Sequence, residues 1–319
     1  MAAPDRLFTP RFFVMCGFNF VVFLSAFQLL PTAPFRIRDL GGSELESYVL
    51  EIMTRAQLDR YKAGHDIDFS YVSEDGGRFR VNVFRKDSGV GAVFRFTGTG
   101  AAVRLDDKGR YFTVVVDGAV QATLATSPGE HSYPLAQGLP AGEHTIELYR
   151  RTEGSFGPTV LLGVDLEGEL LAPPPVQRRI EIVGDSITCG YGNEGAAPCK
   201  FSAETENHYL TYGAVAARAL GAELSTVAWS GKGVVNNYGD DVFEPLPAIY
   251  DRLLASDAAP WGFSWQPDAV VINLGTNDFS TGNDPPEAVF VPAYVGFLEH
   301  LRAVYPDTFI LAIAPTLFG

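Results

Sequence analysis

The sequence has 319 residues, enough for two compact domains, and its 46% hydrophobic and 19% charged residues are typical of a globular protein. It carries 24 Lys and Arg against 38 Asp and Glu, a formal net charge of −14. This sign is wrong for binding the phosphates of nucleic acid, which we exclude as a principal ligand. Three cysteines are too few for a disulfide scaffold or a four-thiolate zinc site, and we expect no metal or cofactor.

The N-terminal part contains an unusually apolar stretch. Residues 12–35 are uncharged and rich in Phe, Val and Leu, and a membrane-spanning helix needs about 20 such residues. We therefore expect a hydrophobic helix that contacts a membrane; an uncleaved signal or a core helix are the alternatives. RFFVMCGFNFVVFLSAFQLLPTAPFRIRDLGGS, residues 11–43, resembles the first transmembrane helix and following loop of a major facilitator superfamily transporter. We assign residues 1–43 to this segment.

Residues 44–91 are predicted to form a small α+β fragment. A helix is expected from Thr54, followed by strands DFSYV (68–72) and RFRVNVF (78–84) around a Glu-Asp-Gly-Gly turn. This stretch resembles the N-terminal domain of the twitching-motility retraction ATPases. No P-loop motif occurs in the sequence, so the resemblance implies no nucleotide chemistry.

Residues 92–172 alternate apolar and polar side chains in short runs separated by turn residues. Asp117-Gly118 lies between two such runs and is a strong hairpin signal. Helical periodicity is absent. The pattern predicts an antiparallel β-sandwich, which is joined to the remaining chain by a stiff linker, Pro173-Pro174-Pro175.

Residues 176–319 follow a different pattern, in which strands alternate with helices. Apolar strands are predicted at 180–183, 223–228, 269–274 and 309–314, and helices at 206–220, 247–254 and 292–304. This order is typical of an α/β fold with a parallel sheet covered by helices on both faces. Ligands of such sheets bind beyond the carboxyl ends of the strands.

Three of these loops carry residues suited to acyl transfer. Gly184-Asp185-Ser186 follows the first strand, Ser230-Gly231 the second, and Asn277-Asp278 the third. A serine hydroxyl can attack an ester, while a backbone N–H at a glycine and an Asn amide are the donors of an oxyanion hole. The alternative is that Ser186 merely caps a helix.

IEIVGDSITCGYG, VAWSGKGV and VINLGTNDFS resemble the first three blocks of the SGNH (GDSL-type) hydrolases, which have a flavodoxin-like sheet. FRFTGTG, VVVDG and AGEHTIELYRRTE resemble the N-terminal, jelly-roll-like domain of the carbohydrate esterase family 2 deacetylases, so the resemblance covers about residues 92–319. It implies that Ser186 is the nucleophile and that its own N–H, Gly231 and Asn277 form the oxyanion hole. It further implies an acetylated carbohydrate substrate, namely a plant cell-wall polysaccharide, and a location outside the cytoplasm.

The general base is not evident. In this family a histidine follows the last strand, and here the sequence ends at Gly319, soon after the fourth predicted strand, so we expect a truncated domain with very low turnover. His208 is the weak candidate that is close to Ser186 in sequence, whereas His300 is expected to face solvent. The alternatives are an inactive, membrane-tethered carbohydrate-binding module and a composite of gene fragments.

Several further residues flank the predicted site. Trp229, Trp261 and Phe279 are candidates for stacking on a sugar ring, although aromatic residues beside strands often belong to the core. Cys189 and Cys199 lie ten positions apart. In an exported protein they are expected to form a disulfide; otherwise they are ordinary buried thiols.

Overall fold

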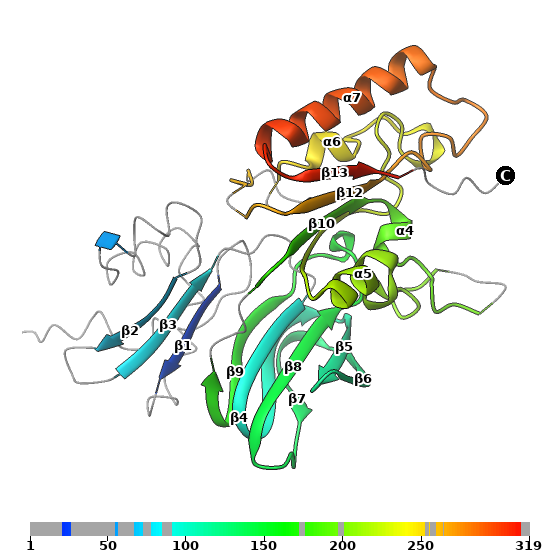
Figure 1. Ribbon diagram of the computed structural model, residues 1–319. Helices are drawn as coiled ribbons and strands as arrows, with labels where there is room; N and C mark the ends of the chain where they lie inside the picture. The colour runs from blue at the N-terminus through cyan, green and yellow to red at the C-terminus, as the bar shows by residue number, and fades with distance from the viewer. Residues whose placement is uncertain are drawn as a thin grey trace, which may run out of the picture.

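The structure is a computed structural model that describes residues 91–171, 176–196, 201–252, 255, 260–263 and 265–313 (Figure 1). Nearer the N-terminus it also describes residues 55–56 and three short strands. The strands form three separate hydrogen-bonded sheets.

The first sheet consists of β1 (Val21–Ala26), β2 (Ile67–Val72) and β3 (Arg78–Phe84), with β3 in the centre and both pairings antiparallel. The predicted strands at 68–72 and 78–84 are confirmed. β1 corrects the helix expected across residues 12–35, because a short apolar run without periodicity fits a strand as well as a helix. The rest of that stretch lies outside the described residues. No helix in the described part of the chain is long and apolar enough to cross a membrane.

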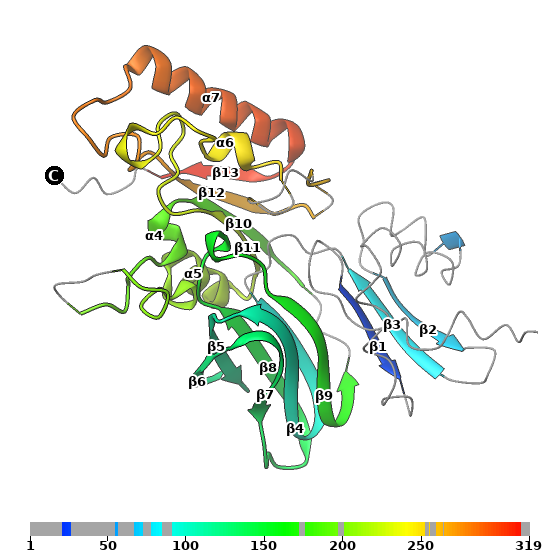
Figure 2. The same ribbon diagram turned by 180° about the vertical axis from the view of Figure 1, so that it is seen from behind.

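The second sheet is antiparallel and has six strands: β4 (Gly91–Lys108), β5 (Tyr111–Val116), β6 (Ala119–Ala125), β7 (Pro128–Ala136), β8 (Gly142–Arg150) and β9 (Val160–Leu171). The first half of β4 pairs with β8 and the second half with β7, while β9 pairs along both halves. β4 and β9 curve strongly (Figure 2). Gly98 and Gly168 lie opposite each other in this pairing, and a Cβ on either would overlap the backbone of the facing strand.

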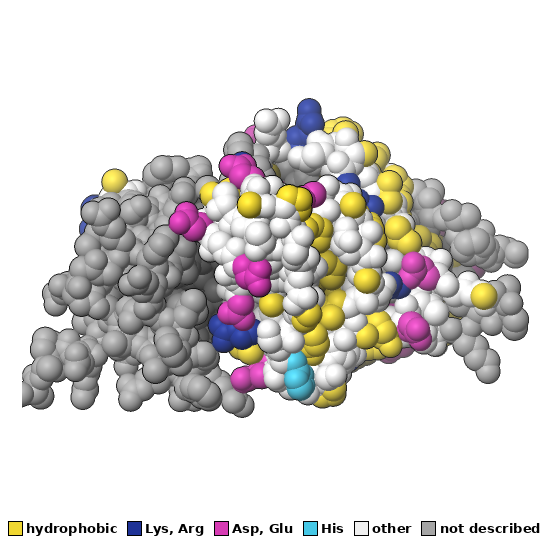
Figure 3. All heavy atoms as spheres, turned by 90° about the horizontal axis from the view of Figure 1, so that it is seen from below, with side chains coloured by type: hydrophobic (Ala, Val, Ile, Leu, Met, Phe, Trp, Pro, Cys, Tyr) yellow, Lys and Arg dark blue, Asp and Glu magenta, His cyan; other side chains and the backbone are white. Residues whose placement is uncertain are grey.

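Alternation along the strands builds the core of this sheet. Phe94, Phe96, Val103 and Leu105 of β4 are buried and pack with side chains of β5 and β8 in one cluster. The predicted Asp117-Gly118 turn joins β5 to β6, and both residues have positive φ, as a two-residue hairpin turn requires. On the face seen in Figure 3, acidic side chains are scattered over the described surface and form no single patch.

The third sheet is parallel throughout, as predicted. Its strands are β10 (Arg179–Gly184), β11 (Glu223–Ala228), β12 (Ala269–Asn273) and β13 (Phe309–Ala312), in the order β11-β10-β12-β13. α5 (Tyr212–Leu220) packs on one face, and α6 (Leu246–Ile249) and α7 (Glu287–Val304) cover the other (Figure 1). α4 (Ser186–Cys189) and the short 3-10 helices η1 (Gly154–Phe156), η2 (His208–Leu210) and η3 (Tyr238–Asp240) complete the described elements.

The start of α7 differs from the prediction. The helix was expected to begin at Pro292 but begins at Glu287, directly after Pro286, so Pro292 lies inside it. Phe290, in the additional turn, contacts the rings of Phe279 and Tyr294. The contact with Phe279, which lies outside the helix, favours a longer helix than the position of the proline indicates.

Candidate active site

The three predicted site loops meet at the carboxyl edge of the parallel sheet. β10 leads to Ser186, β11 to Gly231 and β12 to Asn277, and β10 is the neighbour of both other strands. The Trp229 N–H donates to the Gly184 carbonyl across the ends of β11 and β10, at 3.3 Å. The sheet order therefore places the loops side by side.

Ser186 is the first residue of α4, and its side chain is half-buried. The cap of this helix is Asp185, whose Oδ1 accepts from the Ile187 N–H at 3.0 Å, so the alternative that Ser186 is the capping residue is wrong. A Cβ at Gly184 would overlap the Thr188 side chain. Glycine at 184 thus leaves room for the Thr188 side chain at the start of α4. The Ser186 hydroxyl has no hydrogen-bond partner among the described residues.

Asn277 connects the other two loops. Its Nδ2 donates to the Lys232 carbonyl at 2.8 Å and, over a longer 3.4 Å, to Asp185 Oδ2, and only 6% of the residue is exposed. Since Lys232 follows Gly231 and Asp185 precedes Ser186, this one amide joins the oxyanion candidates to the nucleophile candidate.

Gly231 has a φ of 82°, and its carbonyl accepts from the Tyr238 N–H at 2.7 Å. The backbone N–H groups of Gly231 and Ser186 donate to no other group among the described residues. Both are thus available to a substrate oxygen, as an oxyanion hole requires.

Asp278 holds the residues that follow Gly231 through hydrogen bonds to their backbone N–H groups. Its Oδ1 accepts from Val235 N–H at 2.7 Å and Asn236 N–H at 2.9 Å, and its Oδ2 accepts from Val234 N–H at 2.8 Å. The residue is 1% exposed. Three N–H donors compensate the loss of water around the carboxylate.

Asp185 is also buried, and its electrostatics differ. Burial raises the pKa of Asp185 to about 6, the negative charge of Asp278 adds to the shift, and the Ile187 N–H opposes it. A carboxyl with this pKa is partly protonated in mildly acidic solution.

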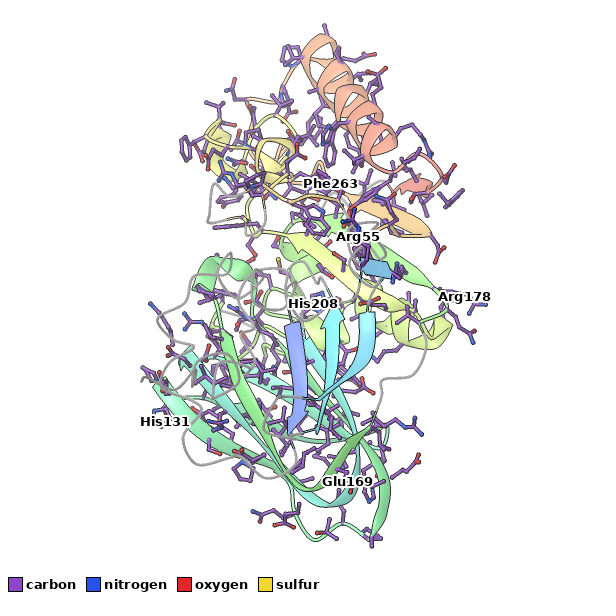
Figure 4. All side chains as sticks on the ribbon, turned by 90° about the vertical axis from the view of Figure 1, so that its left-hand side faces the viewer. Arg55, His131, Glu169, Arg178, His208 and Phe263 are labelled. Atoms are coloured by element: carbon purple, nitrogen blue, oxygen red, sulfur yellow. The ribbon has the colours of Figure 1, made fainter. Side chains whose placement is uncertain are left out.

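His208 does not take the position of a general base. It is buried where η2 meets the antiparallel sheet (Figure 4). Its backbone N–H donates to the Arg151 carbonyl, and its ring Nε2 lies 3.1 Å from Thr226 Oγ1. Burial lowers the pKa of its imidazole to about 4. The four histidines in the described part of the chain contact groups other than Ser186, and His300 pairs with Asp251 at 2.6 Å.

The aromatic candidates separate into two groups. Trp229 is partly buried beside the Ser186 loop, and Phe279, 37% exposed, follows Asp278 directly. Trp261 is 9% exposed and its ring lies 5.9 Å from Phe263, which contacts Tyr305 just before β13 begins. Trp261 therefore belongs to the core near the opposite edge of the sheet, which corrects its assignment as a stacking residue.

Cys189 corrects a further expectation. Its thiol is free and buried, so it forms no disulfide with Cys199, which lies outside the described residues. Its Sγ lies within 4.8 Å of a carboxylate oxygen of both Glu153 and Glu206, a set of atoms of the type that binds metal ions. Burial and the charge of Glu153 raise the pKa of Glu206 to about 8, so a proton on Glu206 accounts for the pairing of the two carboxyls. Neither glutamate stands in a recognisable motif, and sequence reasoning missed both.

The chain matches two known protein families and several characterised proteins. The model "Carbohydrate esterase 2 N-terminal" matches residues 76–175, and "GDSL-like Lipase/Acylhydrolase family" matches residues 182–319. The chain is similar to the cellulase/esterase CelE of Acetivibrio thermocellus, with 41% identity over 241 residues, and to an acetylxylan esterase / glucomannan deacetylase of Cellvibrio japonicus, with 32% identity over 226 residues.

These matches cover 73% and 65% of this chain but 29% and 62% of the two relatives, so the chain spans less than two thirds of either. Among solved structures, a family two carbohydrate esterase from Clostridium thermocellum in complex with cellohexaose aligns with a TM-score of 0.69 and 39% identity, over 73% of each chain. A family two carbohydrate esterase from Cellvibrio japonicus aligns with a TM-score of 0.66 and 25% identity, over 78% of this chain and 75% of that one.

Proposed function

We propose, from the premise that this chain belongs to the family 2 carbohydrate esterases, that it is a serine esterase that removes acetyl groups from carbohydrate hydroxyls. The observation that carries the proposal is the Asn277 amide, which joins the Ser186 loop to the Gly231 loop, while the Ser186 and Gly231 N–H groups have no partner among the described residues. An inactive binding module has no need of such an arrangement.

In the proposed reaction the Ser186 Oγ attacks the acetyl carbonyl carbon and its proton passes to a base. The carbonyl oxygen becomes an oxyanion that accepts from the N–H groups of Ser186 and Gly231 and from Asn277 Nδ2. Collapse expels the sugar oxygen, which takes up a proton, and leaves acetyl-Ser186. Water then attacks the acetyl group and releases acetate. Among the described residues no histidine contacts Ser186, so we assign the base to none of them.

We propose an acetylated polysaccharide as the substrate. Relatives are named for acetylxylan and glucomannan, and one solved neighbour holds cellohexaose. Phe279 and Trp229 flank the site loops and offer apolar rings on which a sugar can stack. We further propose that residues 92–172 close as a sandwich domain beside the hydrolase domain of residues 176–319, and that the protein acts outside the cytoplasm, where such polymers occur.

The test is acetate release from acetylated xylan and glucomannan by the protein and by Ser186→Ala, each with and without added imidazole. Because no described histidine reaches Ser186, we expect slow hydrolysis that imidazole, as an external base, accelerates in the Ser186 protein alone. Equal release by Ser186→Ala, or no release from either protein with imidazole present, would refute the proposal. The Ser186→Ala reactions also correct for hydrolysis by imidazole itself.

A further inference from the structure

The segment that follows β8 connects the antiparallel sheet to the site. Arg151 and Thr152 are only 5% and 4% exposed. The Arg151 guanidinium donates to the carbonyls of Glu204 and Glu206 at 3.0 and 3.3 Å and to the carboxylate of Glu194. The Arg151 carbonyl accepts from the His208 N–H at 3.0 Å. This segment is therefore fixed to the loop that precedes α5.

Glu153, two residues later, reaches the Gly231 loop. Its Oε2 accepts from the Ser230 N–H at 2.7 Å, its Oε1 accepts from the Ser155 hydroxyl, and its own N–H donates to Glu206 Oε1 at 3.2 Å. The Ser230 N–H is the one immediately before that of Gly231. A side chain from the antiparallel sheet domain thus holds the peptide next to the oxyanion donor.

The loop is fixed at three successive residues. Glu153 accepts from the Ser230 N–H, the Gly231 carbonyl accepts from the Tyr238 N–H, and the Lys232 carbonyl accepts from Asn277. The Gly231 N–H, between these contacts, keeps no partner among the described residues. The three bonds together define the orientation of that peptide and leave its donor for a substrate oxygen.

Glu206 lies beside Glu153 in this contact region. It is fully buried, and its Oε2 has no hydrogen-bond partner in the described part of the chain. Burial and the charge of Glu153 raise the pKa of Glu206 to about 8, which favours the neutral form of that carboxyl at pH 7. Hydrogen bonds to charged acceptors are stronger than those to neutral ones, so the contact from the Ser230 N–H is of the kind that can fix a loop.

We propose that Glu153 is a positioning residue of the esterase site, through which the antiparallel sheet domain holds the oxyanion loop in its active geometry. The inference rests on the proposed function, because the loop matters for catalysis only if Gly231 stabilises an oxyanion. The hydrogen bond to Ser230 can be tested independently of turnover.

The first measurement is hydrogen exchange of the peptide that covers residues 229–234, compared among the unchanged protein, Glu153→Ala, Glu153→Gln and Glu143→Ala. Loss of a bond to a charged acceptor should accelerate exchange of the Ser230 amide by about 10- to 100-fold in Glu153→Ala. Glu153→Gln should stay protected, because its amide oxygen can accept from Ser230 while the Ser155 hydroxyl accepts from the amide nitrogen. Glu143 is exposed and pairs with Arg95, so Glu143→Ala is the matched control.

The second measurement is the kinetics of Ser186-dependent acetate release. We expect Glu153→Ala to lower kcat about tenfold or more with KM within about twofold, and Glu153→Gln to restore most of kcat, since the donor acts on the transition state. If Glu153→Ala fails to fold, Glu153→Asp replaces it in both measurements. The aspartate side chain is one methylene shorter, so its carboxylate does not reach the Ser230 N–H.

Unchanged exchange at residues 229–234 in Glu153→Ala would overturn the proposal. Equal acceleration there and at residues 204–210 would also overturn it, because the role would then be domain docking alone. If no variant releases acetate from the acetylated polysaccharide in a Ser186-dependent way while Ser230 exchange responds as expected, the proposed function fails and the contact from Glu153 stands.

Discussion

Replacing Asp278 with asparagine tests whether the buried carboxylate holds the Gly231 loop. The three backbone N–H groups at Val234, Val235 and Asn236 lie 2.7–2.9 Å from its two oxygens. Asparagine has the same shape but one oxygen, so at least one N–H will face an amide NH₂. That unpaired donor costs about 1–3 kcal/mol, and the other bonds lose about 1 kcal/mol each when the charge is removed. Together these losses predict a destabilisation of about 3–5 kcal/mol.

For a domain of about 150 residues this corresponds to a fall in Tm of about 6–20 °C, measurable by calorimetry at pH 7. Asp284→Asn is the matched control, because Asp284 is exposed and its change should leave Tm within about 1 °C. A fall of less than about 2 °C in Asp278→Asn, or a rise, would show that the cost of burying the charge equals or exceeds the value of its three hydrogen bonds. The loop would then be held by its other contacts.

Two further substitutions address the oxyanion donor and a buried carboxyl. Asn277→Ala should lower kcat of acetate release about 10²- to 10³-fold with a smaller change in KM. Asn283→Ala, at an exposed site, is the control and should leave both unchanged. If Asn277→Ala keeps more than a tenth of kcat, the proposed role of Asn277 as an oxyanion donor is contradicted. Burial raises the pKa of Glu181 to about 7 from its ordinary 4.5. The stability that the protonated carboxyl contributes is therefore fully present below about pH 4.5 and is lost as the pH rises through 7. Urea unfolding between pH 5 and 8 should therefore show stability falling by up to about 3 kcal/mol more in the unchanged protein than in Glu181→Gln, and parallel curves would show that the carboxyl is charged when folded.

The sequence allowed the parallel sheet to be predicted closely. The strand expected at 223–228 is β11 with the same bounds, and those expected at 180–183 and 269–274 differ from β10 and β12 by one residue at their ends. Apolar runs of this length, separated by helical segments, have few other solutions. The three site loops followed from the same strands, because parallel strands bring their carboxyl ends to one edge.

Where local pattern was ambiguous, the prediction was wrong. The apolar stretch at 12–35 has no periodicity that separates strand from helix, and the structure forms β1 within it. Pro292 indicated a helix start, yet packing of Phe290 against Phe279 accompanies an earlier one. Burial of a side chain cannot be predicted from its neighbours in sequence alone. For this reason His208 and Cys189 were assigned chemical roles that their contacts do not support.

Contacts between segments distant in the chain could not be predicted from the sequence. Glu153 and Ser230 are separated by 77 positions and follow strands of different sheets, β8 and β11, and nothing in the surrounding residues marks the glutamate. Only the docking of the segment after β8, through Arg151, brings the carboxylate to the loop. The proposed catalytic residues were identified from motifs, whereas the residue proposed to position their loop depends on the tertiary fold.

The two buried acids next to the candidate site raise an electrostatic question, because in the proposed reaction an oxyanion forms near Asp185 and Asp278. Three N–H groups compensate the charge of Asp278, and burial favours the neutral form of Asp185. Asn277 contacts one of these acids: its 2.8 Å bond to the Lys232 carbonyl anchors the amide, and its longer 3.4 Å contact with Asp185 is the one that the oxyanion of the proposed reaction can replace. A weak ground-state contact exchanged for a strong one in the transition state is the differential binding on which catalysis depends.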